Sequence, residues 1–235
     1  MKEKFEDEII DSWKNNVNPW ITAIRDGEIE SRFLVTNKAV VNAILNRKPK
    51  TVLDVGCGEG WLVRELAKIG ISCMGTDIVP KLIEHAKKVG GGRFKTIPYE
   101  NLSHNLLPKK FDLIVCNFSL LGNESVIDLF QQIPALLNKG GLFIVQTIHP
   151  ISGCGEEKYI DGWRKGSWKG FSAEFSKPAP WYFRTLETWK ILFQENGFKL
   201  REVLEPLNPK TKVPASVIFI GQLASRLSIQ KKVLL

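Results

Sequence analysis

The stretch TVLDVGCGEG, residues 51–60, decides the fold of this chain. Its first half is a short apolar run rich in β-branched residues, and WLVRELAKIG, residues 61–70, follows with apolar residues at helical spacing. A buried strand must therefore turn abruptly into a helix. Glycine permits such a turn because it tolerates positive φ and has no Cβ to obstruct a ligand. The pattern predicts a strand, a glycine turn that a ligand can approach closely, and a helix.

The same alternation of short apolar runs and helical patterns continues along the chain, which predicts an α/β fold with a doubly wound, mostly parallel sheet. FDLIVCN shows almost no polar alternation, as expected of a strand buried on both faces. Pro134 is expected to kink the helix at 124–141 or to end its first part. The expected strands are 51–55, 71–77, 93–98, 111–117 and 142–148, with later helices at 80–90, 124–141 and 185–197. The segments 198–206 and 214–222 have nothing helical between them, so we expect an antiparallel pair that closes the sheet.

Two segments fall outside the expected core domain of residues 49–222. Residues 1–48 contain two amphipathic pieces and are expected to form an N-terminal helical lid. Residues 150–184 hold eight aromatic residues without a helical period. We expect this structureless insertion after the fifth strand to form a substrate lid, because ligands bind at the carboxyl ends of parallel strands. Residues 223–235 are expected to be a basic C-terminal tail.

Composition excludes several classes of protein. With 235 residues, 43% of them hydrophobic and 25% charged, the chain is expected to fold. No apolar run approaches the roughly 20 residues that span a bilayer, and MKEKFEDEII lacks the apolar segment of a signal peptide, so we expect a cytoplasmic protein. The four cysteines form no CxxC pair, and no metal site is expected. The net charge of +8 permits an anionic partner, but no basic block is interleaved with aromatic residues, which argues against nucleic acid.

Asp77 ends the second expected strand, 19 residues after Gly58. A carboxylate at that position of a dinucleotide-type fold faces the ribose of a bound nucleoside. The turn reads G-x-G-x-G, whereas the NAD fingerprint is G-x-G-x-x-G, and Trp61 stands where its third glycine would be. Asp54 would repel a pyrophosphate but suits a cationic amino group. Together these residues indicate an adenosine-containing ligand with an amino group, such as S-adenosylmethionine.

LDVGCGEG followed by Asp77 resembles the class I S-adenosylmethionine-dependent methyltransferase family, over about residues 51–221. The resemblance implies a seven-stranded Rossmann-like sheet with an antiparallel last strand. It also implies S-adenosylmethionine as the cofactor and S-adenosylhomocysteine as its product. The catalysed reaction would then be an in-line displacement that moves a methyl group.

The resemblance assigns cofactor contacts to particular residues. Asp54 would orient the methionine amino group, and Asp77 would bind the ribose hydroxyls. The remaining implied contacts are Gly56, Cys57 and Gly58 along the methionine and ribose, Ile78, Tyr99 and Glu100 around the adenine, and Asn117 beside the methyl group. In the N-terminal segment, Trp13, Trp20 and Arg32 could form part of a lid, with Arg32 pairing with the methionine carboxylate.

Candidate catalytic and acceptor residues follow the fifth strand. His149 is the first candidate for a base, against a structural histidine at a strand end, and Tyr182 could orient or deprotonate the acceptor. Arg164 and Arg184 stand among aromatic residues that include Trp163 and Trp181. Such arginines can bind a carboxylate or phosphate of the acceptor, or they can extend to solvent from a small aromatic core.

Three classes of function remain open at this point. An aromatic lid favours methyl transfer to a small molecule, because a macromolecular acceptor needs an open face. The sequence pI of 9.3 favours an RNA or protein methyltransferase instead. A catalytically silent S-adenosylmethionine-binding regulatory module is the third reading, and the turn spacing argues against an NAD oxidoreductase.

Overall fold

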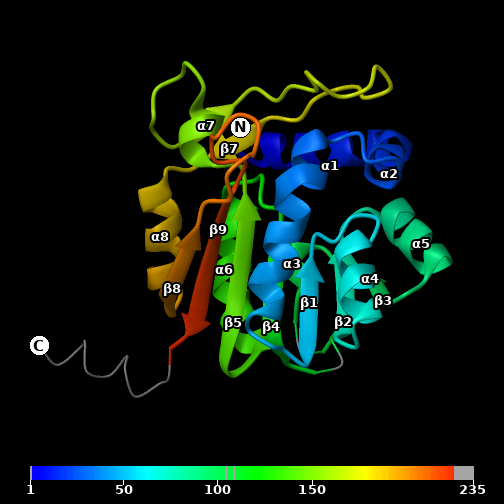
Figure 1. Cartoon of the computed structure of the whole chain (residues 1–235), viewed down its shortest axis with the longest axis vertical. Helices are drawn as coiled ribbons and strands as arrows, with labels where there is room; N and C mark the ends of the chain where they lie inside the picture. The colour runs from blue at the N-terminus through cyan, green and yellow to red at the C-terminus, as the bar shows by residue number, and fades with distance from the viewer. Residues whose placement is uncertain (1, 104, 108, 225–235) are drawn as a thin grey trace, which may run out of the picture.

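The centre of the protein is a seven-stranded sheet with the strand order β3-β2-β1-β4-β5-β9-β8 (Figure 1). The computed structural model describes residues 2–103, 105–107 and 109–224. The neighbouring strands β3, β2, β1, β4 and β5 run parallel to one another. Strand β9 runs antiparallel to both β5 and β8. This arrangement confirms the predicted doubly wound sheet with an antiparallel last strand. The strands are β1 (Thr51–Val55), β2 (Ser72–Asp77), β3 (Arg93–Thr96), β4 (Phe111–Asn117), β5 (Leu137–Thr147), β8 (Phe198–Leu204) and β9 (Val217–Leu223).

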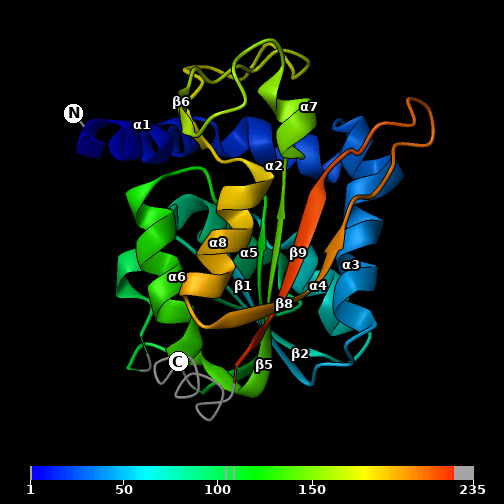
Figure 2. The same cartoon turned by 90° about the vertical axis from the view of Figure 1, so that its left-hand side faces the viewer.

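Helices cover both faces of this sheet, as Figure 2 shows. Alternate residues of β4 pack against the helices on opposite faces of the sheet. Leu113 and Val115 belong to the core beneath α3, α4 and α5, whereas Ile114 and Cys116 belong to the core beneath α6 and α8. All four are fully buried, which explains why this strand carries no polar alternation. The covering helices are α3 (Asn37–Leu45), α4 (Trp61–Lys68), α5 (Pro80–Val89), α6 (Glu124–Leu136) and α8 (Leu186–Glu195).

The predicted end of the helix at 124–141 is wrong. Helix α6 ends at Leu136, two residues after Pro134, and β5 begins at the next residue instead of at 142. Leu137 pairs with Phe111 of β4, and the side-chain amide of Asn138 donates to the Asp112 carboxylate at 2.8 Å. These contacts with β4 hold the chain in the sheet where the local pattern predicts helix.

The N-terminal segment divides into two parts. Helices α1 (Lys2–Asn15) and α2 (Val17–Arg25) lie across the carboxyl ends of the parallel strands (Figure 1). A π-helical turn, η1 (Arg32–Thr36), then leads into α3, which packs on the sheet. Only the first part therefore covers the edge of the sheet. Within the described residues, no helix combines the length and hydropathy needed to cross a lipid bilayer.

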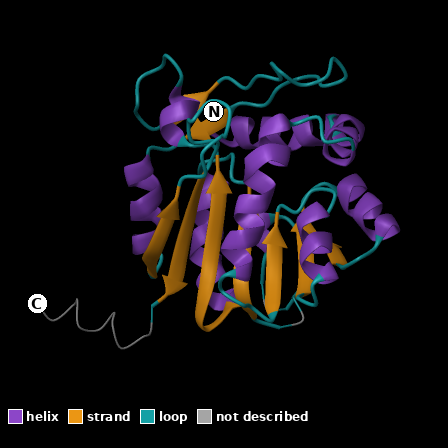
Figure 3. Ribbon diagram, in the orientation of Figure 1, coloured by secondary structure: helices purple, strands orange, loops and turns teal. Residues whose placement is uncertain are grey.

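The insertion after β5 has more regular structure than predicted. It contains α7 (Pro150–Cys154) and a hairpin of β6 (Gly162–Arg164) and β7 (Trp181–Phe183), joined by long loops (Figure 3). The backbone polar groups of β6 and β7 pair with each other across that hairpin. A sequence rich in glycine and proline does not predict this pairing. Of the predicted basic tail, residues 225–235 lie outside the described residues.

The insertion packs on α1, on the side away from the sheet (Figure 2). Asn16 exchanges two hydrogen bonds of 2.8 Å with the backbone of Ser176, and the hydroxyl of Ser12 donates to the Lys177 carbonyl at 2.7 Å. The rings of Trp13 and Trp168 stand edge to face with centroids 6.0 Å apart. The cover over the sheet edge thus has two layers, with α1 inside and the insertion outside.

Candidate active site at the carboxyl ends of the parallel strands

The glycine turn after β1 adopts a backbone that glycine favours. Gly56, Gly58 and Gly60 have φ values of +75°, +56° and +88°. A Cβ at Gly56 would lie 2.3 Å from the Cβ of Ser119, and one at Gly58 would lie 3.3 Å from Nε1 of Trp20. The turn therefore brings its backbone against the chain on both sides, and side chains are excluded for steric reasons.

Asp77 at the end of β2 is held against this turn. Its Oδ2 accepts the backbone N–H of Gly58 at 2.9 Å, and its Oδ1 accepts that of Val79 at 2.9 Å. Burial raises the pKa of this carboxyl, while the backbone N–H donors oppose the rise. A carboxylate can accept about four hydrogen bonds. Both oxygens therefore keep capacity for ligand hydroxyls in a fixed orientation.

Asp54 and Arg32 are two buried charged residues beside the turn. Asp54 is 2% exposed, and burial, with the nearby Asp77, raises its pKa to about 8. Arg32 is 8% exposed, and burial lowers its pKa to about 10. The guanidinium lies 5.5 Å from the ring centroid of Trp20 and 5.1 Å from that of Trp61. The two rings thus hold a buried cation near a buried acid.

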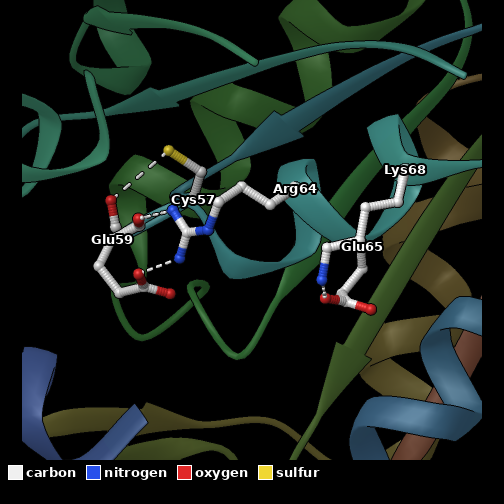
Figure 4. A network of polar contacts seen from close by, with 6 residues as sticks. Cys57, Glu59, Arg64, Glu65 and Lys68 are labelled. Atoms are coloured by element: carbon white, nitrogen blue, oxygen red, sulfur yellow. Dashed lines mark hydrogen bonds and ion pairs between the residues drawn. The ribbon is translucent and has the colours of Figure 1, made fainter. Parts of the chain in front are cut away.

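A separate ion pair supports the turn from α4. Figure 4 shows Arg64 extending back along the helix to Glu59, whose carboxylate it binds. Nη1 of Arg64 also donates to the backbone carbonyl of Glu59 at 2.7 Å. Glu59 is only 5% exposed, so this partner offsets the cost of burying its charge. The neighbouring pair of Glu65 and Lys68 is exposed and lies farther along the helix.

Arg32, Asp54, Asp77 and the start of the glycine turn line a cavity of about 290 Å³. Helices α1 and α2 form its cover, and the loop after β4 forms one wall. The ten residues predicted to bind the cofactor all line it: Arg32, Asp54, Gly56, Cys57, Gly58, Asp77, Ile78, Tyr99, Glu100 and Asn117. Tertiary structure thus brings together residues from a π-helical turn, strands and loops that lie up to 85 positions apart in the sequence.

The two predicted catalytic residues do not line this cavity. His149 is buried at the start of α7, and its Nε2 lies 2.9 Å from a carboxylate oxygen of Glu205. Tyr182 lies in β7, where its backbone N–H donates to the Leu121 carbonyl at 2.7 Å and its ring packs edge to face on Trp163. Tyr182 therefore contacts the loop after β4, whereas His149 contacts Glu205, which follows β8.

The predicted acceptor residues also lie away from the cavity. Arg184 is 3% exposed and donates to the carbonyls of Gly122 and Asn123 at 2.8 and 3.0 Å. Arg164 binds the Glu157 carboxylate and donates to the Lys158 carbonyl at 2.6 Å. Trp163 and Trp181 belong to the same hairpin. The insertion arginines therefore bind their own chain, which already supplies the oxygens that an acceptor was expected to bring.

Residues that the sequence did not single out line the cavity instead. Along α1, Glu6, Ile9 and Ile10 lie on one helical face with Trp13. Phe118, directly after β4, has a φ of +54°. This backbone conformation is energetically unfavourable for a residue with a large side chain. The apolar spacing of α1 signals a buried face. It carries no information about what that face covers.

A family model described as a methyltransferase domain matches residues 30–203 of the chain. The chain belongs to this methyltransferase family. The match begins just before Arg32 and ends in β8, so it includes all ten of these cavity-lining residues and the whole glycine turn. The protein is an S-adenosylmethionine-dependent methyltransferase, and its sheet order agrees with the Rossmann-like class I fold.

Relatives of this methyltransferase differ in how much of the chain they share. An uncharacterized protein of Haemophilus influenzae is 27% identical over 223 residues, covering 83% of this chain and 85% of the relative. A ribosomal protein L11 methyltransferase of Clostridium botulinum is 40% identical over 103 residues, covering 42% and 31%. A ubiquinone biosynthesis O-methyltransferase of Pelagibacter ubique is 34% identical over 101 residues, covering 42% of each chain. The chain thus spans less than half the length of these two named methyltransferases.

Solved structures share the fold of this methyltransferase. An S-adenosylmethionine-dependent methyltransferase of Mesorhizobium loti superposes with a TM-score of 0.59 at 22% identity, covering 77% of this chain and 96% of that one. A 1,6-didemethyltoxoflavin-N1-methyltransferase of Burkholderia thailandensis, solved with S-adenosylhomocysteine, gives a TM-score of 0.62 at 16% identity, covering 96% and 91%. At these identities the likeness concerns the fold.

The polar atoms of the methyltransferase site fit its cofactor. Within the described residues, Asp54 Oδ1, Arg32 Nη2 and Asn117 Oδ1 are buried without a hydrogen-bond partner. Buried polar atoms normally have partners, so these three atoms suit polar groups of a ligand. An acid, a guanidinium and an amide oxygen complement the ammonium and carboxylate of an amino acid. The glycine turn supplies the space beside them.

Proposed function

We propose that this methyltransferase acts on a small molecule enclosed beneath helices α1 and α2. The observation that carries the proposal is the shared cavity, which Trp13 and Trp20 of the cover line together with Asp54 and Gly58 of the cofactor side. Trp20 approaches the turn so closely that a Cβ at Gly58 would meet its indole nitrogen. A cavity covered by helices suits a small acceptor, whereas a macromolecule needs an open face.

In this proposal the chain binds the two ends of the cofactor with different residues. Asp54 binds the ammonium and Arg32 the carboxylate of the methionine part, while Asp77 binds the ribose hydroxyls. Tyr99, Glu100 and Ile78 flank the adenine, and Asn117 lies beside the reacting groups. S-adenosylmethionine supplies an already activated methyl group on its sulfonium when it is bound.

The chain's own contribution is alignment and exclusion of water. Helices α1 and α2 cover the cavity, and the loop after β4 fixes one wall, so an acceptor is held in one orientation. His149 and Tyr182 do not line the cavity, and we propose that they position the cover. The acceptor side of the cavity, meaning α1 and residues 118–122, is thus the part that selects the substrate.

The relatives support this proposal unequally. The ubiquinone biosynthesis O-methyltransferase supports a small-molecule acceptor, and the ribosomal protein L11 methyltransferase supports a protein acceptor. Each likeness covers only 42% of this chain. The enclosed cavity favours the small molecule.

Calorimetric titration with S-adenosylhomocysteine tests the cofactor side, with NAD as the control ligand. We expect about micromolar binding that Asp77→Ala weakens by about 1–3 kcal/mol, because a buried charged hydrogen bond is lost. Failure of the folded wild-type protein to bind would overturn the proposal.

Transfer of tritiated methyl groups tests the acceptor. The protein is incubated with labelled S-adenosylmethionine and with separate small-molecule, RNA and protein fractions from the source cells. Label in the small-molecule fraction supports the proposal. Label confined to RNA or protein would overturn it, and binding without any transfer would indicate a silent regulatory module.

A further inference from the structure

The cavity is acidic although the chain as a whole is basic. Its lining, within the described residues, includes five carboxylates and one guanidinium, a formal charge of −4 in a chain of net charge +8. Burial raises the pKa of Asp54 to about 8, so protonation of this carboxyl leaves −3. Bound S-adenosylmethionine contributes one positive charge. The charged lining groups are Glu6, Asp7, Arg32, Asp54, Asp77 and Glu100.

No arginine of the insertion offsets this charge. Arg184 and Arg164 are both engaged by backbone carbonyls of their own chain and do not line the cavity. Arg32 lies beside Asp54, on the cofactor side. Among the described lining residues, an anionic acceptor would therefore meet carboxylates, and no cationic side chain on the acceptor side would bind it.

Aromatic rings accompany the carboxylates on the acceptor side. Trp13 of α1 and Phe118 of the loop after β4 both line the cavity there. The face of an aromatic ring attracts a cation within about 6 Å of its centroid. Arg32 already shows this contact inside the same cavity, between Trp20 and Trp61.

The carboxylate best able to bind a ligand is that of Asp7. Glu6 is already engaged, since its two oxygens accept hydrogen bonds from Asn123, Glu124 and Ser125. Asp7 is exposed at the cavity edge and makes no hydrogen bond or ion pair with the described part of the chain. Its neighbours Ile9 and Ile10 supply apolar surface on the same helix.

We propose that the methyl acceptor carries a positively charged group, such as a protonated amine, on an apolar body, and that Asp7 binds that group at the cavity edge. The inference rests on the proposed small-molecule function. It differs from one of the two readings of the sequence, in which Arg164 and Arg184 would bind an anionic acceptor.

Separation of the acceptors by charge tests the inference. A small-molecule extract of the source cells is divided by ion exchange at neutral pH into cationic, neutral and anionic fractions, and each is incubated with the protein and tritiated S-adenosylmethionine. We expect labelled product from the cationic fraction. Product from the neutral or anionic fraction alone would overturn this inference while leaving the small-molecule function intact. Absence of product from all three would overturn the proposed function itself.

Charge variants of α1 test the assigned residue, with the active component of the cationic fraction as substrate. Asp7→Asn should raise the KM for that component about two- to fivefold, as expected for a partly exposed ion pair, and Asp7→Lys should raise it further. The KM for S-adenosylmethionine should stay constant. Asp11→Asn is the matched control, because Asp11 lies one turn along α1 and does not line the cavity. An unchanged or lower acceptor KM in Asp7→Lys would overturn the assignment.

Discussion

The Oε1 atom of Glu6 in α1 accepts the backbone N–H of Asn123, 2.7 Å away, at the start of α6. The same oxygen accepts the N–H of Glu124 at 3.1 Å, and Oε2 accepts the hydroxyl of Ser125 at 2.7 Å. The first N–H groups of a helix have no partner within it, and an acid is favoured there. A residue 117 positions earlier thus caps α6 and ties the cover to the core.

Glu6→Ala removes this cap and the contact between cover and core. We expect a loss of about 1–2 kcal/mol in the free energy of unfolding, the usual value for a lost cap. Limited proteolysis should also cut α1 faster, because the cover is released. Glu8→Ala is the control, since within the described residues Glu8 pairs only with the exposed Lys4 on the same helix. Equal behaviour of the two variants would contradict the capping role.

The pKa of Asp54 predicts how stability depends on pH. Burial and Asp77 raise this pKa from 3.8 to about 8, so between these values the folded protein holds a proton that the unfolded chain releases. The stability contributed by this carboxyl is therefore present at low pH and is lost as the pH rises toward 8. Asp54→Asn should show a smaller fall in unfolding free energy from pH 5 to 8 in denaturant titrations. Parallel curves for the two proteins would refute this prediction.

The same carboxyl predicts the pH dependence of ligand affinity. If Asp54 binds the ammonium of S-adenosylhomocysteine, binding favours the ionised acid and releases its proton. Affinity should rise from pH 6 to 8 by at most about tenfold per pH unit, and Asp54→Asn should flatten the rise. Calorimetry in two buffers of different ionisation enthalpy measures the released proton directly. Affinity that falls over this range would count against the contact.

His149 offers a test between catalytic and positioning roles. Because its Nε2 bonds Glu205 and the ring lies outside the cavity, His149→Asn should lower the free energy of unfolding by about 1 kcal/mol. The methyl-transfer rate should change little. A general base contributes about 10²- to 10⁴-fold, so a rate loss of that size would restore the base role. Glu205→Gln, which alters the other partner, should match the stability loss.

Phe118 combines a place on the cavity wall with a φ of +54°. Phe118→Asn keeps a residue that tolerates this backbone conformation and removes the ring. We expect a higher acceptor KM with unchanged affinity for S-adenosylhomocysteine. Lys48→Asn is a matched control, because Lys48 has a φ of +49° and does not line the cavity. A weaker S-adenosylhomocysteine affinity in Phe118→Asn would place the ring on the cofactor side instead.

Several features of the fold follow from short stretches of sequence. The turn at Gly56 and Gly58 is predictable because positive φ and close approach both require glycine. The unbroken apolar run of β4 predicts burial on both faces. The end of α6 was not predictable, because Leu137 and Asn138 leave the helix only through their contacts with β4.

The sequence by itself determined the sheet, the glycine turn and the acid at Asp77, because local sterics and apolar periodicity act within a few residues. Only the tertiary structure decided which segment covers the cavity. The bonds that settle this, Glu6 to Asn123 and Asn16 to Ser176, join residues 117 and 160 positions apart. No local pattern specifies such pairs, because they form only once the core has brought the distant segments together.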